Sequence, residues 1–360
     1  MVPFASWSVL TTDFLIVLYL TLGGATFAAI LQLSGARWQA EVRTVSLALF
    51  ALFPLALVLL VILLAAGATT FPWVGLEEHA GGWSTYTLLP QAGGTSTVQL
   101  PTWHNYRFLV VRQLAGFLLV SLLHWRYIQF KAGGDQSTAN KARTRQIAYW
   151  ILVVYVLYGT MVAWDFEMTL LPEWHSAIFG MYHFVSNFGM FISFIAVLMC
   201  FLRSSVTLAR PIPDLAFDYL AQMMLAFSML WMYTFFSQYL TIWYGNIPHE
   251  ANRVNEMEVG DYSVLWWSFI VLKFVIPFSM LIFDYVRHSP ILVVIIGWGI
   301  ILGTWMESYT WISASHPAGP FQPGYMPMSS FFDILSTVAI LLAGFVLIRR
   351  ALLRSAVAGV

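Results

Sequence analysis

Residues 162–184 read VAWDFEMTLLPEWHSAIFGMYHF, and in this stretch two long apolar segments meet through a short polar loop. An apolar segment of about 20 residues is long enough to cross the hydrocarbon core of a bilayer as a helix. The stretch therefore predicts two spanning helices that meet at one membrane face. A set of ionisable side chains lies at this junction: Asp165, Glu167, Glu173, His175 and His183.

Ionisable groups inside or beside a spanning helix cost several kcal/mol unless they are paired, hydrated or turned toward a bundle interior. For Glu167 and Glu173 the favoured interpretation is an interfacial side chain that reaches water at a helix end. Asp165 and His183 lie further inside their apolar segments. For these two residues a proton route or polar ligand site and a merely interfacial position are both open.

The composition is that of a polytopic membrane protein. Hydrophobic residues make up 59% of the 360 residues, charged residues only 9%, and the mean hydropathy is +0.75. A soluble domain of this size would not tolerate such a surface, so we expect an all-α bundle of membrane-spanning helices in contact with lipids. The formal net charge is zero and basic tracts are missing from the sequence, which argues against a nucleic-acid partner. The single Cys200 excludes an internal disulfide, a cysteine-ligated zinc site and an iron–sulfur cluster held by this chain alone.

Nine segments are long and apolar enough to span a bilayer, and together they predict one integral membrane domain over residues 1–360. They cover about 10–32, 45–66, 107–130, 146–168, 177–202, 215–243, 262–285, 290–313 and 330–349. The first segment has no basic region before it and is read as a spanning helix rather than a cleavable signal peptide. Lys and Arg concentrate beside the loops after the first, third, fifth and seventh segments and at the C-terminus. This bias predicts an N-terminus outside and a C-terminus in the cytoplasm.

The depth of each ionisable residue follows from the helical rise of about 1.5 Å per residue. The outer half is predicted to hold Asp165, His183, Glu307 and Arg112; Lys273 falls near the middle; and the inner half holds His124, Asp218 and Asp284. This distribution is typical of two half-paths for protons that approach each other near a buried lysine. The alternative is that Lys273 neutralises Glu307 or Asp284 in a buried pair. Asp218 and Asp284 lie so close to the inner boundary that we expect them to be solvated.

The sequence predicts no cofactor, metal or catalytic residue on this chain. A b-type haem needs two axial ligands at matching depth, whereas His124 and His183, the two histidines well inside segments, belong to opposite halves. Motifs for nucleotide or zinc chemistry are also missing from the sequence. A quinone headgroup needs polar partners beside an apolar and aromatic channel. Asp165, His183 and Gln238, the last in the stretch FFSQYLTIWYGNIPHEANR (235–253), are candidates for that role.

Three stretches together resemble one known family. They are Trp164–Gly180 (WDFEMTLLPEWHSAIFG), Gln238–Glu250 (QYLTIWYGNIPHE) and Phe274–Phe278 (FVIPF). They are similar to signatures of the second polysulfide-reductase-type (NrfD-like) membrane subunit of alternative complex III, a bacterial quinol:cytochrome c oxidoreductase. The chain departs from that pattern at Phe166, Thr169 and Ala177, and it has Glu307 where the family tends to have Asp. The family is usually described with ten helices, not nine.

The resemblance implies a cofactor-free subunit of a bacterial inner membrane that scaffolds the complex and passes protons. Its expected partners are a larger homologous quinol-binding subunit, for example one that oxidises menaquinol, and periplasmic subunits with iron–sulfur clusters and several c-type haems. Asp165 and Glu307 are the residues carried over from the family pattern. His183, Lys273, Asp218, Asp284 and His124 rest on depth alone. A self-contained secondary transporter and a purely structural anchor are the competing hypotheses.

Overall fold

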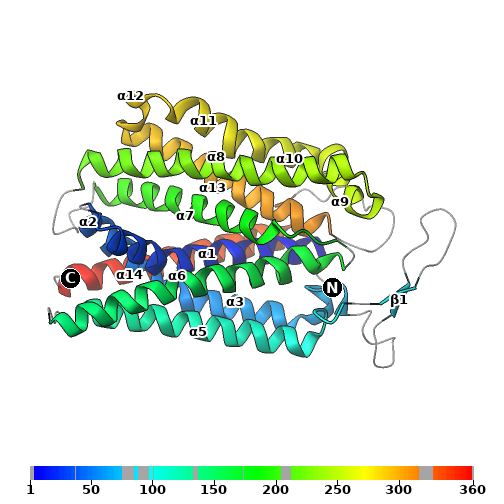
Figure 1. Ribbon diagram of the computed structural model, residues 1–360, viewed down its shortest axis with the longest axis horizontal. Helices are drawn as coiled ribbons and strands as arrows, with labels where there is room; N and C mark the ends of the chain where they lie inside the picture. The colour runs from blue at the N-terminus through cyan, green and yellow to red at the C-terminus, as the bar shows by residue number, and fades with distance from the viewer. Residues whose placement is uncertain are drawn as a thin grey trace.

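The chain forms a bundle of long helices that run roughly along one axis (Figure 1). This computed structural model describes residues 4–36, 38–74, 85–87, 97–99, 101–132, 137–172, 174–203, 212–315 and 327–358. The long helices are α1 (Phe4–Leu33), α5 (Tyr106–Ala132), α6 (Thr138–Phe166), α7 (Phe179–Arg203), α8 (Asp214–Gly245), α13 (Pro290–Ser313) and α14 (Phe331–Ala358). Two further spans are each built from three helical pieces. These are α2 (Gln39–Ala48), η1 (Leu49–Leu52) and α3 (Phe53–Ala65), and then α10 (Ser263–Ile270), η4 (Val271–Val275) and α11 (Ile276–Leu281).

Short elements lie between the spans. They are η2 (Gly67–Thr69), the antiparallel strands β1 (Thr85–Thr87) and β2 (Thr97–Gln99), η3 (Met168–Leu170), α9 (Pro248–Val259) and α12 (Asp284–Arg287). Glu173 and His316 lie outside the described residues.

The predicted all-α fold is confirmed, because the described residues contain nine helices long and apolar enough to cross a membrane. Five predicted ends differ from the structure by four or more residues, and the first two spans each begin six residues earlier than predicted, at Phe4 and Gln39. The fourth span begins at Thr138 rather than 146, since Ser137 caps the helix by accepting a hydrogen bond from the Asn140 N–H at 3.2 Å, and a polar first turn is invisible to hydropathy. The seventh ends at Leu281 rather than 285, where Phe283 takes an extended conformation. The last helix continues to Ala358.

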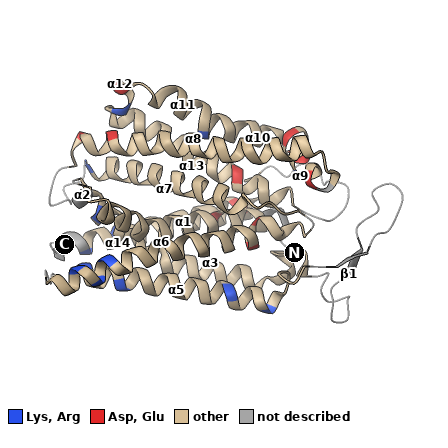
Figure 2. Ribbon diagram, viewed as in Figure 1, with Lys and Arg blue, Asp and Glu red and all other residues tan. Residues whose placement is uncertain are grey.

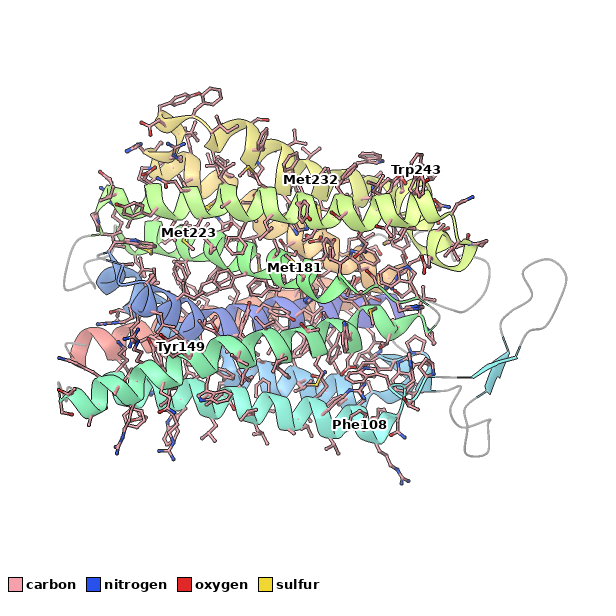
Figure 3. All side chains as sticks on the ribbon, in the orientation of Figure 1. Phe108, Tyr149, Met181, Met223, Met232 and Trp243 are labelled. Carbon is pink, nitrogen blue, oxygen red and sulfur yellow. The ribbon has the colours of Figure 1, made fainter. Side chains whose placement is uncertain are left out.

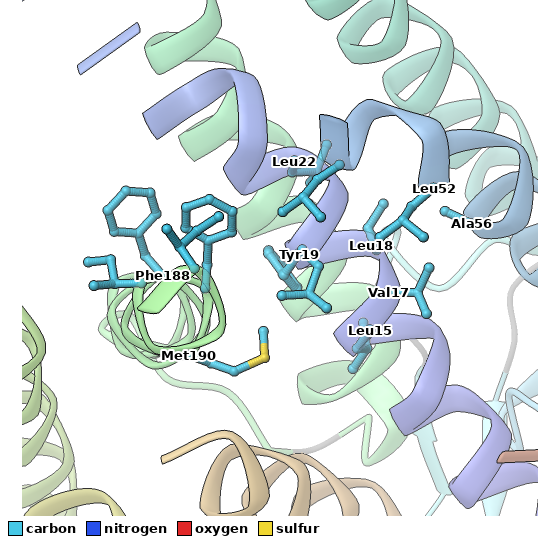
Figure 4. Close-up of a cluster of buried hydrophobic side chains, with 14 of the residues drawn as sticks. Leu15, Val17, Leu18, Tyr19, Leu22, Leu52, Ala56, Phe188 and Met190 are labelled. Carbon is cyan, nitrogen blue, oxygen red and sulfur yellow. The ribbon is translucent and has the colours of Figure 1, made fainter. Parts of the chain in front are cut away.

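The two central helices are α1 and α7. α7 packs against α6, α8, α13 and α1, while α1 also packs against α2, η1, α3 and α14. Figure 4 shows the contact between them, where Leu15, Tyr19 and Leu22 of α1 face Phe188 and Met190 of α7. Leu52 and Ala56 cover the other side of α1. The interior is therefore closed by apolar packing, and the polar groups described below interrupt it locally.

Charge and exposure fit a membrane orientation. With an odd number of spans, the N-terminus and C-terminus lie at opposite ends of the bundle (Figure 1). Basic side chains gather at the end that holds the C-terminus, and acidic ones mark α9 at the other end (Figure 2). We call these the inner and outer ends, following the predicted orientation. Large apolar side chains such as Phe108, Tyr149, Met181 and Trp243 are exposed along the sides of the bundle (Figure 3), as expected for surfaces that contact lipid or partner helices.

Candidate functional site: a buried ionic network

Glu307 on α13 is the centre of a hydrogen-bonded network inside the bundle. Its Oε2 accepts from Lys273 Nζ of η4 and from Ser186 Oγ of α7 at 2.6 Å. Its Oε1 accepts from Trp231 Nε1 of α8 at 2.7 Å and from the Tyr182 hydroxyl of α7. Glu307 and Lys273 are each only 2% exposed. A buried carboxylate with one cation and three further donors has all of its charge compensated.

The network continues at both ends of the carboxylate. Lys273 Nζ also donates to Ser186 Oγ at 2.6 Å and lies 4.4 Å from the centre of the Trp231 ring. On the opposite side, Trp311 Nε1 donates to the Tyr182 hydroxyl at 3.1 Å. An amine, two hydroxyls and a carboxylate thus form an unbroken chain of groups that can exchange protons.

The local backbone explains how Lys273 reaches Glu307. Lys273 is the middle residue of η4, a single π-helical turn within an otherwise α-helical span. Pro277 follows four residues later and has no N–H to bond the Lys273 carbonyl in the α-helical pattern, so the widened turn is the expected local response. Gly303, one turn before Glu307, lets η4 approach α13 closely. A Cβ added at Gly303 would lie 2.7 Å from Lys273 Cγ.

A small pocket adjoins the network on its inner side. It encloses about 220 Å³ of space between atoms, including its open mouth, and it is lined by Val185, Ser186, Gly189, Met224, Phe227, Ser228, Trp231, Lys273 and Ile300. Along α7, α8 and α13, Gly189, Ser228 and Ile300 are each closer to the inner end than the network residues of the same helix. The pocket therefore extends from Lys273 toward the inner end, with polar groups at Ser186 and Ser228.

His183 does not join this network but pairs with Glu167. Its Nε2 lies 3.2 Å from Glu167 Oε2, and both side chains are buried. The prediction that Glu167 reaches water at a helix end is wrong, because this residue is 1% exposed. The hydropathy pattern places Glu167 near the end of a span, but α9 and the residues around Trp174 cover that end.

Arg253 of α9 closes the outer end above these groups. Its guanidinium donates to the backbone carbonyls of Glu167 at 2.8 Å and Trp311 at 2.9 Å, and to Ser315 Oγ at 2.5 Å. It lies between the Trp174 and Trp311 rings, 4.6 and 4.9 Å from their centres. Burial lowers the pKa of Arg253 to about 9, which keeps it cationic at neutral pH. One side chain thus ties α9 to the ends of α6 and α13.

Asp165 forms a separate and fully paired site. It accepts two hydrogen bonds from Arg112, at 2.6 and 2.9 Å, one from Gln113 at 2.5 Å and one from Trp103 Nε1 at 2.7 Å. Arg112 also lies 4.2 Å from the centre of the Trp103 ring. This bidentate pair joins α5 to α6 and has the geometry of a structural ion pair. The hydrogen bonds among the described residues do not connect it to Glu307.

The inner end holds the other two predicted acids. Arg287 donates to Asp218 at 3.1 Å and to Asp284 at 2.9 Å, and Gln222 donates to Asp218 at 2.8 Å. Asp284 is solvated as predicted, with 76% of its side chain exposed, whereas the same prediction for Asp218 is wrong because Arg287 and Gln222 cover it. Asp218, Asp284 and His288 have ligand atoms within 4.8 Å of one another. The Arg287 guanidinium is already hydrogen-bonded to both carboxylates.

The remaining candidates are isolated. His124 lies between the carbonyl oxygens of Val120 and Leu22, at 2.8 and 3.1 Å, and so links α5 to α1. Gln238 is buried, and its Oε1 accepts from Ser176 Oγ at 3.4 Å. Neither is bonded to the other candidates among the described residues.

Of the residues singled out from the sequence, the structure pairs Lys273 with Glu307, His183 with Glu167 and Arg112 with Asp165, and the first of these pairs forms the network. The network residues missed by the sequence reasoning are Tyr182, Ser186 and Trp231, and the outer-end residue missed is Arg253. The spacing of Tyr182 and Ser186 by one helical turn could have indicated a polar face on α7. Asp13 of α1, which accepts from Trp305 at 2.8 Å and Thr337 at 2.6 Å, was within reach of the depth argument and was missed.

A scan against protein-family models finds no match to this chain, and a search of curated proteins finds none either. What the protein does is therefore argued from its own residues and from the resemblance noted in its sequence.

Proposed function

We propose that this chain is a cofactor-free membrane subunit of a quinol-oxidising electron-transfer complex, which scaffolds the complex and relays protons through the Lys273–Glu307 network. The observation that supports the relay most directly is the buried hydrogen-bonded chain of Lys273, Ser186, Glu307 and Tyr182. Ionisable groups at this depth are costly and are commonly functional in membrane proteins. The family resemblance supplies the electron-transfer context.

The pocket beside Lys273 supplies the inner access in this proposal. A proton reaches Lys273 or Ser186 through water held near Ser228, and Glu307 is the next acceptor. Ten residues of α8 separate Ser228 from Asp218 at the inner end, a rise of about 15 Å. Apolar side chains fill most of this stretch. Proton entry therefore requires water to penetrate along α8, which makes it the slow and controllable step.

The proposed partners follow from the resemblance and from the surface. A homologous quinol-binding membrane subunit would contact the exposed apolar sides of the bundle, while iron–sulfur and multihaem c-type subunits would sit on the outer end. Quinol oxidation itself is assigned to the partner, and electrons pass to its periplasmic acceptors. The localisation proposed is a bacterial inner membrane.

The assembly is tested by purification from the native membrane in a gentle detergent, followed by mass spectrometry of the co-purifying chains and an optical spectrum. We expect c-type haem bands and chains with iron–sulfur motifs. A chain that emerges alone and colourless would refute the proposal in its main consequence.

The relay is tested in the purified complex by the Glu307→Gln variant, with proton release measured per electron delivered to the acceptor. We expect proton release to fall at least several-fold while electron transfer continues. The matched control is Asp284→Asn, since Asp284 is an exposed acid at the inner end. If Glu307→Gln lowers only stability, the chain is a structural anchor.

One observation favours the alternative of a self-contained secondary transporter. The second and seventh spans are both interrupted, by the 3₁₀ turn η1 before Pro54 and by the π turn η4 before Pro277. Paired interrupted spans often mark a transporter's binding site. Substrate uptake by the purified chain in liposomes would support this function over the relay.

A further inference from the structure

Glu167 is a buried carboxylate that is only half satisfied. It follows the last residue of α6, and its Oε2 lies 3.2 Å from His183 Nε2. Its Oε1 has no hydrogen-bond partner among the described residues. Buried carboxylate oxygens are rarely left in this state, because the group loses its hydration without gaining a hydrogen bond in exchange.

Asn187 lies beside the His183 ring and has a second buried acceptor without a donor. Its Nδ2 donates to the His183 carbonyl at 3.0 Å and lies 3.3 Å from both ring nitrogens, while its Oδ1 finds no donor within the described part of the chain. Asn187 is 1% exposed and His183 is 2% exposed. Two buried acceptors beside the His183 ring, Glu167 Oε1 and Asn187 Oδ1, therefore lack donors among the described residues. A proton or an internal water could donate to them with little displacement of the surrounding atoms.

The titratable groups near Glu167, apart from His183, come from α9, η4, α1 and α7. Arg253 of α9 binds the Glu167 backbone carbonyl, and no ion pair with the carboxylate is present among the described residues. Lys273 of η4 interacts with Glu167 at longer range but is paired with Glu307 of α13. Tyr19 of α1 and Tyr182 of α7 are uncharged, and both lie close enough to Glu167 to interact electrostatically with its carboxylate. The charge on Glu167 is therefore compensated at contact distance only when His183 carries a proton.

We propose that Glu167, His183 and Asn187 form a second proton-binding site, completed by one internal water on Glu167 Oε1, which accepts protons from the Lys273–Glu307 network. One proton is held between Glu167 and His183: the neutral acid beside neutral imidazole and the carboxylate beside imidazolium have the same net charge. Tyr182 binds Glu307 and directly precedes His183 on α7, and its hydroxyl interacts electrostatically with the Glu167 carboxylate. In this proposal Tyr182 is therefore the group between the two sites, although hydrogen bonds among the described residues do not join them. This inference deepens the proposed relay and rests on it for the direction of transfer, whereas proton binding itself does not depend on any partner.

The test uses the full chain in lipid nanodiscs, labelled with ¹³C-carboxyl glutamate, and follows the carboxylic-acid carbonyl band by infrared spectroscopy during a pH titration. Glu167 and Glu307 lie within the apolar spans of the described chain, and Glu41 of α2 lies one residue before the second of these spans. In the Glu307→Gln background we expect a titrating, label-sensitive band from Glu167 in addition to those of the other labelled glutamates. This component should be missing from the spectra of Glu167→Gln/Glu307→Gln, while the other bands stay. Glu250→Gln, a half-buried acid of α9, is the control that leaves the band unchanged.

A second variant keeps the site testable if Glu167→Gln fails to fold. Asn187→Leu retains Glu167 and His183 but removes the amide beside the ring, so the titration midpoint should shift and the carbonyl band should change frequency. The imidazolium bands of His183 are followed in the same titration, because a proton held on the imidazole gives no carboxylic-acid band. Absence of both a titrating carbonyl band and a titrating imidazolium band in Glu307→Gln, or bands that are unchanged in both Glu167→Gln and Asn187→Leu, would overturn the site. A titrating site in a complex that releases no protons would instead refute the proposed relay and leave the binding site standing.

Discussion

Removing the cation of the Lys273–Glu307 pair should cost far more than removing the pair as a whole. In Lys273→Met, Glu307 keeps its donors Tyr182, Ser186 and Trp231 but loses its charge partner in a site that is 2% exposed. Breaking a buried pair from one side typically destabilises by about 3–5 kcal/mol. Glu307→Gln should cost a similar amount, because it leaves a buried ammonium.

The double variant Lys273→Met/Glu307→Gln leaves no charge behind and should cost only about 1–2 kcal/mol, since neutral replacement of a buried pair is often nearly neutral. Two single losses of about 3–5 kcal/mol then give a coupling energy of roughly 4–9 kcal/mol, well above that of ordinary contacts. The exposed pair Arg203–Asp214, with side chains 41% and 60% exposed, is the matched control. Its coupling should stay within about 1 kcal/mol.

The measurement is reversible unfolding of the chain in bicelles or mixed micelles with increasing sodium dodecyl sulfate, followed by tryptophan fluorescence for the four members of each cycle. An additive cycle at Lys273 and Glu307, with coupling no larger than at Arg203 and Asp214, would show that the two groups do not face each other as ions. That result would remove the charged chain on which the relay proposal rests.

Three further outcomes are expected. Asp165→Asn should destabilise the chain by about 3–5 kcal/mol in the same unfolding assay, because it leaves the buried guanidinium of Arg112 without a counter-charge. Proton release per electron in the assembled complex should stay unchanged, because this pair lies outside the network. Slowed proton release at native stability would contradict this. Gly303→Ala should cost about 1–3 kcal/mol and weaken the Lys273 contact, because its Cβ would lie 2.7 Å from Lys273 Cγ, whereas Gly299→Ala, with its nearest neighbour at 3.7 Å, should be tolerated. Burial lowers the pKa of His104 from 6.5 to about 4. The unfolded chain therefore binds a proton that the folded chain does not between these values, so stability should rise by about 3 kcal/mol from pH 4 to 6.5, and His104→Asn should flatten that rise.

Hydropathy predicted the nine spans because a lipid environment leaves few alternatives: each span must be long, apolar and internally hydrogen-bonded. The errors in the predicted span ends lie outside the hydrocarbon core, where this constraint no longer applies. The first turns of α6, with Lys141 and Arg145, lie beyond the apolar core and are helical through capping at Ser137. The break after Leu281 depends on the backbone at Phe283, which a smoothed hydropathy profile does not resolve.

The site was less predictable because sequence position gives depth but not rotation about a helix or the identity of neighbouring helices. Asp165 and Glu307 are both acids of the outer half, yet one faces Arg112 and the other faces Lys273. Which pairing occurs is decided by packing, such as the close approach at Gly303, and packing is invisible to a depth argument. Glu167 was misjudged for the same reason, since α9 folds back over the end of α6 through Arg253.

The buried charges also differ in what can change them. Arg112 and Lys273 are each paired with a carboxylate of their own, Asp165 and Glu307. The carboxylate of Glu167 instead has His183 as its partner at contact distance, and its Oε1 has no donor among the described residues. A proton added to this pair therefore meets an open acceptor rather than a completed ion pair. Among the described buried pairs, the imidazole–carboxylate pair thus offers an open acceptor to a proton that the Lys273–Glu307 network delivers, while the Arg112–Asp165 pair holds α5 against α6.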